Sequence, residues 1–203
     1  MTDTSRLETF CDGVFAIAIT LLVLGIRVPG VKEDLGAALL NEWPTFLAYL
    51  ISFVTVGIMW VNHHRLFALI ERSNPTFAYI NVGFLLFVAF VPYPTELMAT
   101  QFAGLNDDGK RLAMLLYSGT FLAIAIMFNA IWLYASSGAR LLKPGLDLEA
   151  LKVGARRFAF GPPAYLIITL LAIVNPYVSL TLVGLLAVYW MLPGSAPVEA
   201  PRQ

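Results

Sequence analysis

Ionisable side chains that could carry protons or hold an ion lie at the ends of two apolar segments. Arg6, Glu8 and Asp12 are at the start of the first segment, and His63 and His64 are at the end of the second. An ionisable group at membrane depth costs at least about 2.5 kcal/mol near a helix centre, so each needs a partner or a function. Two interpretations stay open. Either Arg6 and Asp12 are interfacial anchors and the histidines face headgroups, or Asp12 pairs with Arg6 or a histidine and locks the first helix against the second.

The same residues give little support to metal binding or covalent catalysis. Adjacent residues such as His63 and His64, with Asn62 before them, point about 100° apart on a helix, whereas ligation from one face uses i, i+4 spacing. A metal site would need ligands from other helices. Cys11 is the single cysteine and has no clear base nearby, and no Ser-Gly motif accompanies the histidines. We therefore expect no catalytic residue, metal or cofactor, and no enzyme activity.

The first apolar segment carries a stripe of branched aliphatic residues. Ile17, Leu21 and Leu24 follow i, i+4, i+7 spacing, with Gly13 and Thr20 beside them. On periodicity alone, such a stripe faces lipid or packs in a core. If copies of this helix met around an axis, the stripe would form stacked aliphatic rings, which can gate a pore by dewetting. The pattern does not decide between these interpretations.

The composition places all of these residues in a membrane protein. Of the 203 residues, 59% are apolar and 13% are charged, and the mean hydropathy is +0.76. A bilayer-spanning helix needs roughly 20 apolar residues, so the chain has room for five to seven spans and no large soluble domain. The formal net charge is zero, so no charged tail points to nucleic acid.

Apolar runs separated by polar, Gly or Pro residues predict an all-α membrane protein with six transmembrane helices in one domain, residues 1–203. The first run is read as a retained span rather than a cleaved signal. Gly161-Pro162-Pro163 predicts a kink if the fifth helix starts near Arg157, and Asn175-Pro176 predicts a tight turn into the sixth. The predicted spans are about 10–28, 43–63, 77–98, 111–135, 157–174 and 177–192.

The distribution of basic residues predicts that both termini are cytoplasmic in a multi-pass protein of the cell membrane. Most of the 13 Lys and Arg residues fall on the side of the termini. These are Arg6, Arg65, Arg72, Arg140, Lys143, Lys152, Arg156, Arg157 and Arg202.

Two stretches carry a resemblance to a known family. Arg6-Leu7-Glu8-Thr9-Phe10-Cys11-Asp12-Gly13-Val14-Phe15-Ala16-Ile17-Ala18-Ile19-Thr20-Leu21-Leu22-Val23-Leu24 closely resembles the first-helix signature of bacterial relatives of the lysosomal potassium channel transmembrane protein 175. Trp60-Val61-Asn62-His63-His64-Arg65-Leu66-Phe67 is a second match. The resemblance implies a homotetramer in the lipid bilayer, with a pore formed by the four first helices.

The resemblance also assigns roles to residues of the first helix. The family motif Arg-x-x-x-Phe-Ser-Asp falls on Arg6, Phe10, Cys11 and Asp12 and is expected to hold the pore helix against its neighbours. The hydrophobic constriction falls on Ile17, with Leu21 and Leu24 as further rings, and Thr20 matches a pore-proximal position that influences selectivity. Asn62, His63 and His64 are supporting polar residues. Cys11 replaces the usual Ser, and its weaker hydrogen bonding predicts a looser polar contact there.

Two functions follow as hypotheses. The first is a leak-like, potassium-permeable cation channel of modest selectivity, because an aliphatic constriction offers no oxygens to replace the hydration shell of an ion. Other monovalent cations are left open as permeant ions. Glu33, Asp34 and Glu42 in the first outer loop are candidates for excluding anions. The alternative is a proton-conducting or proton-coupled transporter that uses Asp12, His63 and His64.

Overall fold

A computed structural model describes residues 3–104, 106–139, 141–146 and 148–191. The regular secondary structure of this part of the chain is helical, apart from isolated bridge residues, of which Ile70 and Leu142 pair with each other. The α-helices are α1 (Ser5–Leu21), α2 (Leu35–Asn41), α3 (Trp43–Phe67), α4 (Pro75–Phe90), α5 (Pro92–Ala103), α6 (Asp107–Ser136), α7 (Leu148–Val174) and α8 (Pro176–Met191). Two 3₁₀ turns, η1 (Leu22–Gly25) and η2 (Ser137–Ala139), follow α1 and α6.

Several helices begin at side chains that accept hydrogen bonds from backbone N–H groups without a helical partner. Asn74 accepts a hydrogen bond from the Phe77 amide at 2.8 Å, and Asn106 accepts from Asp108 and Gly109. Asn175 caps α8 in the same way and makes the turn out of α7 a single residue long. Such caps contribute about 1 kcal/mol each. The tight turn predicted at Asn175-Pro176 is therefore present.

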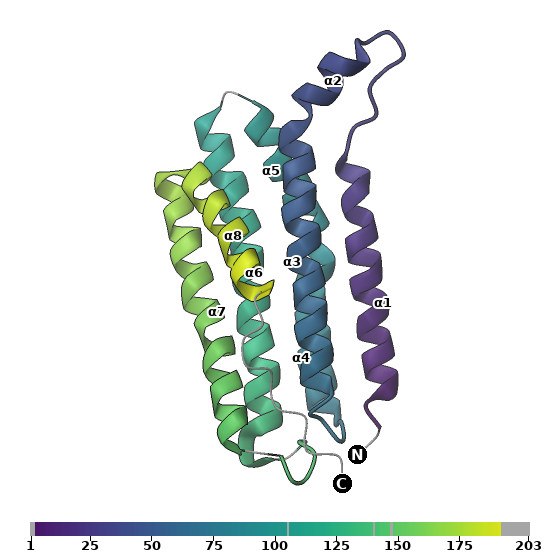
Figure 1. Cartoon of the computed structure of the whole chain (residues 1–203), viewed down its shortest axis with the longest axis vertical. Helices are drawn as coiled ribbons and strands as arrows, with labels where there is room; N and C mark the ends of the chain where they lie inside the picture. The colour runs from purple at the N-terminus through teal and green to yellow at the C-terminus, as the bar shows by residue number, and fades with distance from the viewer. Residues whose placement is uncertain (1–2, 105, 140, 147, 192–203) are drawn as a thin grey trace.

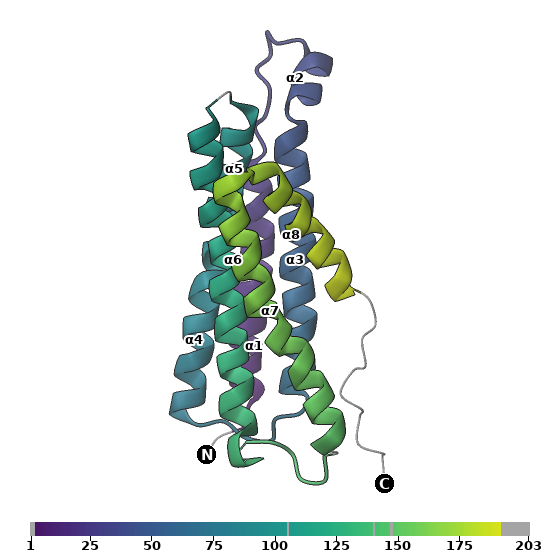
Figure 2. The same ribbon diagram turned by 90° about the vertical axis from the view of Figure 1, so that its left-hand side faces the viewer.

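Prolines interrupt two of the predicted spans. Pro92 separates α4 from α5, so the third predicted span is a pair of helices in series rather than one straight helix. Pro162 and Pro163 lie inside α7, because this helix begins at Leu148 and not near Arg157. The missing proline N–H groups weaken the helical ladder, and Figure 2 shows that the axis of α7 changes direction along its length.

The long helices form an elongated bundle in which α6 is central (Figure 1). It packs against α4, α5, α7 and α8, and it carries many of the fully buried side chains of the bundle, including Tyr117, Phe121 and Ile124. The first helix lies at the edge of the bundle, against α3 and α4. The short helix α2 projects beyond the bundle at the end opposite the start of α1. This arrangement leaves one long face of α1 without a neighbour in the chain.

Four helical stretches of the described chain are long and apolar enough to cross a membrane: α1 with η1 (Ser5–Gly25), α3 (Trp43–Phe67), α4 with α5 (Pro75–Ala103) and α6 (Asp107–Ser136). The apolar part of α7 from Phe158 to Val174, and α8 (Pro176–Met191), are shorter and coincide with the last two predicted spans. The α-helical ladder of the first segment ends at Leu21, so the predicted span to residue 28 includes a 3₁₀ turn and an extended segment.

Candidate functional site

The first helix has two apolar faces that differ in their surroundings. Phe15 and Ala18 are 1% exposed and pack with Cys11 and Leu22 in the interior of the bundle. On the other face Ile17 is 60% exposed, and Leu21 and Leu24 are also exposed. The predicted stripe therefore does not pack in the core of its own chain. It is free to contact lipid or another copy, although Leu24 extends the stripe from the 3₁₀ turn rather than from the α-helix.

Thr20 belongs to this exposed face. Its hydroxyl lies 3.0 Å from the Ala16 carbonyl and 2.9 Å from the Ile17 carbonyl and donates back into its own helix. A hydroxyl has one proton and two lone pairs, so the lone pairs still point outward and can accept a hydrogen bond. Thr20 thus offers an oxygen in an otherwise aliphatic stripe.

Two polar contacts join the start of α1 to the end of α3. The Asp12 carboxylate accepts a hydrogen bond of 2.8 Å from the Trp60 indole N–H. One turn away, Glu8 Oε1 lies 3.1 Å from His64 Nδ1, and this contact is an ion pair when the histidine is protonated. The predicted partners of Asp12, Arg6 or a histidine, are wrong, because Trp60 takes that place. The expectation that these two helix ends are neighbours is confirmed.

The spacing of these two contacts, called the α1–α3 tie below, explains why they fix a single rotation of α1 against α3. Glu8 and Asp12 are four residues apart on α1, and Trp60 and His64 are four residues apart on antiparallel α3, so each pair shares one helix face. The rings of Trp60 and His64 also stack, with centroids 6.2 Å apart. A rotation of α1 by one residue would break both contacts together.

His63 points away from this tie and into the interior. It is fully buried, and its Nε2 lies 3.1 Å from Asn81 Oδ1 on α4. Because the Asn81 amide nitrogen donates to the Phe77 carbonyl, its oxygen is left to accept, and His63 Nε2 must carry the proton. The imidazole stacks on Phe84 at 4°, with ring centroids 5.5 Å apart. Within the described chain, Nδ1 is buried without a hydrogen-bond partner.

Other predicted site residues are not part of this cluster. Arg6 and Phe10 are exposed, and within the described residues the Arg6 guanidinium makes no ion pair or hydrogen bond. Asn62 turns toward a pocket on the opposite side of α3. The roles of Trp60 and Asn81 were missed from sequence. The signal for Trp60 was its i, i+4 relation to His64, whereas Asn81 stands in an apolar run without a comparable signal.

Cys11 is fully buried on the inward face of α1. Among the described residues its thiol makes no hydrogen bond, so at this position the helix is held by packing. No group of three or more His, Cys, Asp or Glu side chains that could hold a metal ion occurs in the described chain.

At the opposite end of α1, Arg27 organises the first loop. Its guanidinium contacts Glu33 at 2.8 Å and Glu42 at 3.1 Å. The hydrogen bond from Arg27 holds the pKa of Glu33 below its usual value, and the same contacts raise the pKa of Arg27. Asp34 caps α2 by accepting from the Ala37 amide. The three acidic residues considered for anion exclusion are thus engaged in local structure.

Comparisons with known proteins place this geometry in a family. Residues 6–92 match the family described as endosomal/lysosomal potassium channel TMEM175. A protein of Chamaesiphon minutus named as a potassium channel is 43% identical over 198 residues, and the match covers 96% of each chain. The bovine endosomal/lysosomal proton channel TMEM175 is 36% identical over 166 residues, which are 76% of this chain and 33% of that protein.

The fold gives the same result as the sequence. The crystal structure of a TMEM175 homologue from Chamaesiphon minutus, described as a homologue of a lysosomal potassium-selective channel, superposes with a TM-score of 0.83 at 40% identity. The superposition covers 93% of this chain and 96% of that one. The matched proteins are described as channels and not as enzymes. The chain therefore belongs to the TMEM175 family.

Proposed function

We propose that this protein is a potassium-permeable cation channel of the cell membrane. The unit is the whole chain, residues 1–203, spanning the bilayer six times with both termini in the cytoplasm, and four copies assemble around a common axis lined by α1. The relative from Chamaesiphon minutus is named a potassium channel, and the matched crystal structure from that organism is described as a homologue of a lysosomal potassium-selective channel, which supports potassium as the transported ion.

The observation that carries this proposal is the unpartnered aliphatic face of α1. A helix that faced only lipid would not need two polar ties to set its rotation, because lipid chains are as apolar as leucine and accept either face. The Asp12–Trp60 and Glu8–His64 contacts fix which face of α1 is presented outward. That face carries Ile17, which is 60% exposed.

In the proposed assembly Ile17 forms the narrowest ring, and Leu21 and Leu24 form further rings toward the outer end. Such rings exclude water when narrow and give modest discrimination among cations, because they supply no coordinating oxygens. The Thr20 lone pairs are the oxygen nearest to the constriction. Of the three acidic residues of the first loop, Glu33 and Glu42 are paired with Arg27, whereas Asp34 caps α2 without a basic partner among the described residues and so keeps its net charge for attracting cations at the outer mouth.

A flux assay in liposomes tests the proposal. The purified protein is reconstituted with a potassium gradient and a proton ionophore as charge shunt, and the unchanged protein is compared with Ile17→Asn. We expect faster potassium flux, or flux with less selectivity over sodium, because the amide hydrates the constriction. The matched control is Ile167→Asn on α7, where the isoleucine is 59% exposed. Equal effects of the two substitutions, or no flux from either protein after verified incorporation, would refute the pore assignment.

Proton transport is the second candidate, and two observations favour it. The mammalian relatives are named proton channels, and His63 keeps a buried ring nitrogen without a hydrogen-bond partner in the described chain. However, His63, His64 and Asp12 each contact a different residue rather than one another. Proton flux without potassium, lost in His63→Gln but kept in Ile17→Asn, would support this function over the first.

A further inference from the structure

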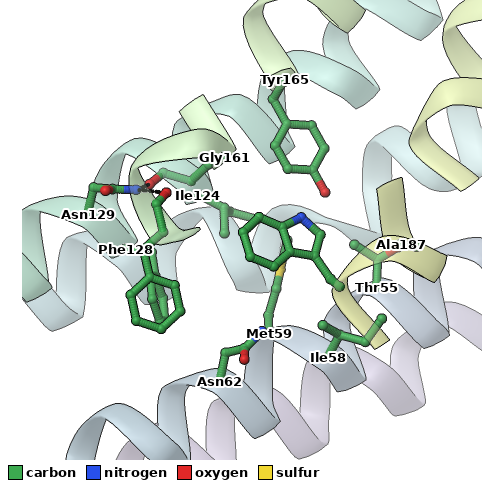
Figure 3. Close-up of a pocket in the computed structure, with 13 residues that line it drawn as sticks. Thr55, Ile58, Met59, Asn62, Ile124, Phe128, Asn129, Gly161, Tyr165 and Ala187 are labelled. Atoms are coloured by element: carbon green, nitrogen blue, oxygen red, sulfur yellow. Dashed lines mark hydrogen bonds between the residues drawn. The ribbon is translucent and has the colours of Figure 1, made fainter. Parts of the chain in front are cut away.

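A pocket of about 60 Å³ lies on the side of α3 that faces away from α1. It is bounded by four helices, with Met59 from α3, Phe128 from α6, Gly161 from α7 and Ala187 from α8 among its walls (Figure 3). None of its 13 lining residues is charged, and most are aliphatic or aromatic. Apolar walls in a membrane protein exclude ions and favour an uncharged occupant.

One polar group in this pocket lacks a partner. Tyr165 as a residue is 3% exposed, its hydroxyl opens onto the pocket, and no described residue is hydrogen-bonded to it. In Figure 3 the ring comes down from α7 with its hydroxyl directed into the space between the other lining side chains. Because this hydroxyl opens onto the pocket and not onto an acceptor of the protein, an occupant that can form a hydrogen bond gains a contact with it.

Tyr117, another buried tyrosine of the bundle, shows the contrast. The Tyr117 hydroxyl lies 2.9 Å from the Ser52 hydroxyl, which in turn lies 2.9 Å from Thr95. Its polar atom is satisfied within the protein. The Tyr165 hydroxyl instead faces the pocket, where the Asn62 side chain from α3 supplies a further polar group.

We propose that this pocket binds the hydroxyl end of a small, uncharged, membrane-soluble alcohol. The volume corresponds to about two water-sized groups, which fits a hydroxyl and the first carbons of a chain but not a whole aromatic molecule, since an apolar cavity that holds benzene measures about 150 Å³. The alkyl part lies against the apolar walls and leaves through the open side. A lipid acyl chain would fill the same space but would leave the Tyr165 hydroxyl unpaired.

The test is photolabelling of the full-length protein in lipid nanodiscs with octanol that carries a diazirine on its chain. We expect saturable labelling of the segments that line the pocket, in competition with plain octanol. Tyr165→Phe removes the hydroxyl and keeps the ring, and it should raise the half-saturating concentration about five- to tenfold. Tyr79→Phe makes the same change on an exposed ring of α4 and should leave the value unchanged.

A second variant tests the volume of the pocket separately from the hydroxyl of Tyr165, and a second probe tests whether the hydroxyl of the ligand is needed. Gly161→Ala adds a methyl group 3.6 Å from the Ala125 Cβ, an ordinary contact distance, so it should fold, narrow the pocket and weaken labelling while the hydroxyl is retained. Diazirine-bearing octane, which lacks the hydroxyl, should label the pocket poorly. Equal labelling by the alkane, no effect of Tyr165→Phe, or diffuse labelling that does not saturate would overturn the proposal and leave an acyl chain or water as the occupant.

Discussion

Asn129, in the last third of α6, stabilises the bundle by replacing a hydrogen bond that a proline removes from α7. Pro162 has no N–H, so the carbonyl four residues earlier, that of Phe158, loses its helical donor. The Asn129 amide nitrogen donates to this carbonyl at 2.9 Å from the neighbouring helix. We therefore predict that Asn129→Leu, which keeps the volume and removes the amide, destabilises the protein because Pro162 is present.

The expected magnitude follows from the partners of this amide. Asn129 also donates to the Ala125 carbonyl at 2.9 Å, but that carbonyl keeps its backbone bond within α6. A single bond, to Phe158, is therefore at stake. Hydrogen bonds between membrane helices average about 0.6 kcal/mol and reach about 1.7, and an unpaired carbonyl in apolar surroundings costs more than an exposed one. We expect a loss of about 1 kcal/mol in the free energy of unfolding.

A double-mutant cycle isolates this interaction. Unfolding is followed in mixed micelles of mild detergent and SDS for the unchanged protein, Asn129→Leu, Pro162→Ala and the double variant. Pro162→Ala restores an N–H that can bond Phe158, so in that background Asn129→Leu should cost less than about half as much. Pro163→Ala is the matched control, because its new N–H faces the Ala159 carbonyl and leaves Phe158 dependent on Asn129. An equal cost of Asn129→Leu in all three backgrounds would refute the reasoning.

Three further predictions concern the ends of α1. Asp12→Ala removes the acceptor for Trp60 and should lower the tetramer fraction in native mass spectrometry more than it changes the potassium-to-sodium ratio; an intact assembly with altered ion ratios would contradict this. Arg27 lowers the pKa of Glu33 in the folded protein below the unfolded value of about 4.3. The ionised Glu33 therefore stabilises the folded state fully above about pH 4.3, and this stabilisation is lost as the pH falls through the lower, folded pKa. A carboxyl NMR titration should show a higher midpoint in Arg27→Gln, and equal midpoints would exclude the pairing. Cys11, fully buried and the single cysteine, should react slowly with maleimide until SDS unfolds the protein, so rapid labelling of folded protein would argue against this packing.

The helical content and the position of several helix starts were predictable because polar caps and prolines are local signals. Asn74, Asn106 and Asn175 begin helices at the predicted breaks, and their side chains bond the amides that lack helical partners. The length of α7 was not predictable, since the basic and acidic residues before Phe158 end an apolar run without ending a helix. Hydropathy marks the part of a helix that lipid can solvate, and hydrogen bonding decides where the helix itself begins.

The compensation of Pro162 also lies beyond what a local pattern can predict. The position of the proline indicates which carbonyl loses its donor, but the replacement comes from a residue 29 positions away along the chain. The sequence shows only that Asn129 is a polar residue within a predicted apolar span, 111–135. Its partner could be named only when the packing of α6 on α7 was known.

The orientation of α1 shows most clearly what sequence alone could and could not decide. Spacing correctly grouped Ile17, Leu21 and Leu24 on one face, but the opposite face is apolar as well, with Phe15 and Leu22 on it. In water the more apolar face of a helix would turn inward. In a bilayer, lipid solvates both apolar faces of α1 equally well, so the surroundings do not determine which face turns toward the bundle. The rotation of α1 about its axis is set by two residue pairs, Asp12 with Trp60 and Glu8 with His64. Their donors and acceptors come within hydrogen-bond distance at only one such rotation. Glu8 and Asp12, acidic residues near the start of α1 that are costly to place in a membrane, therefore direct the aliphatic face of this helix away from the bundle.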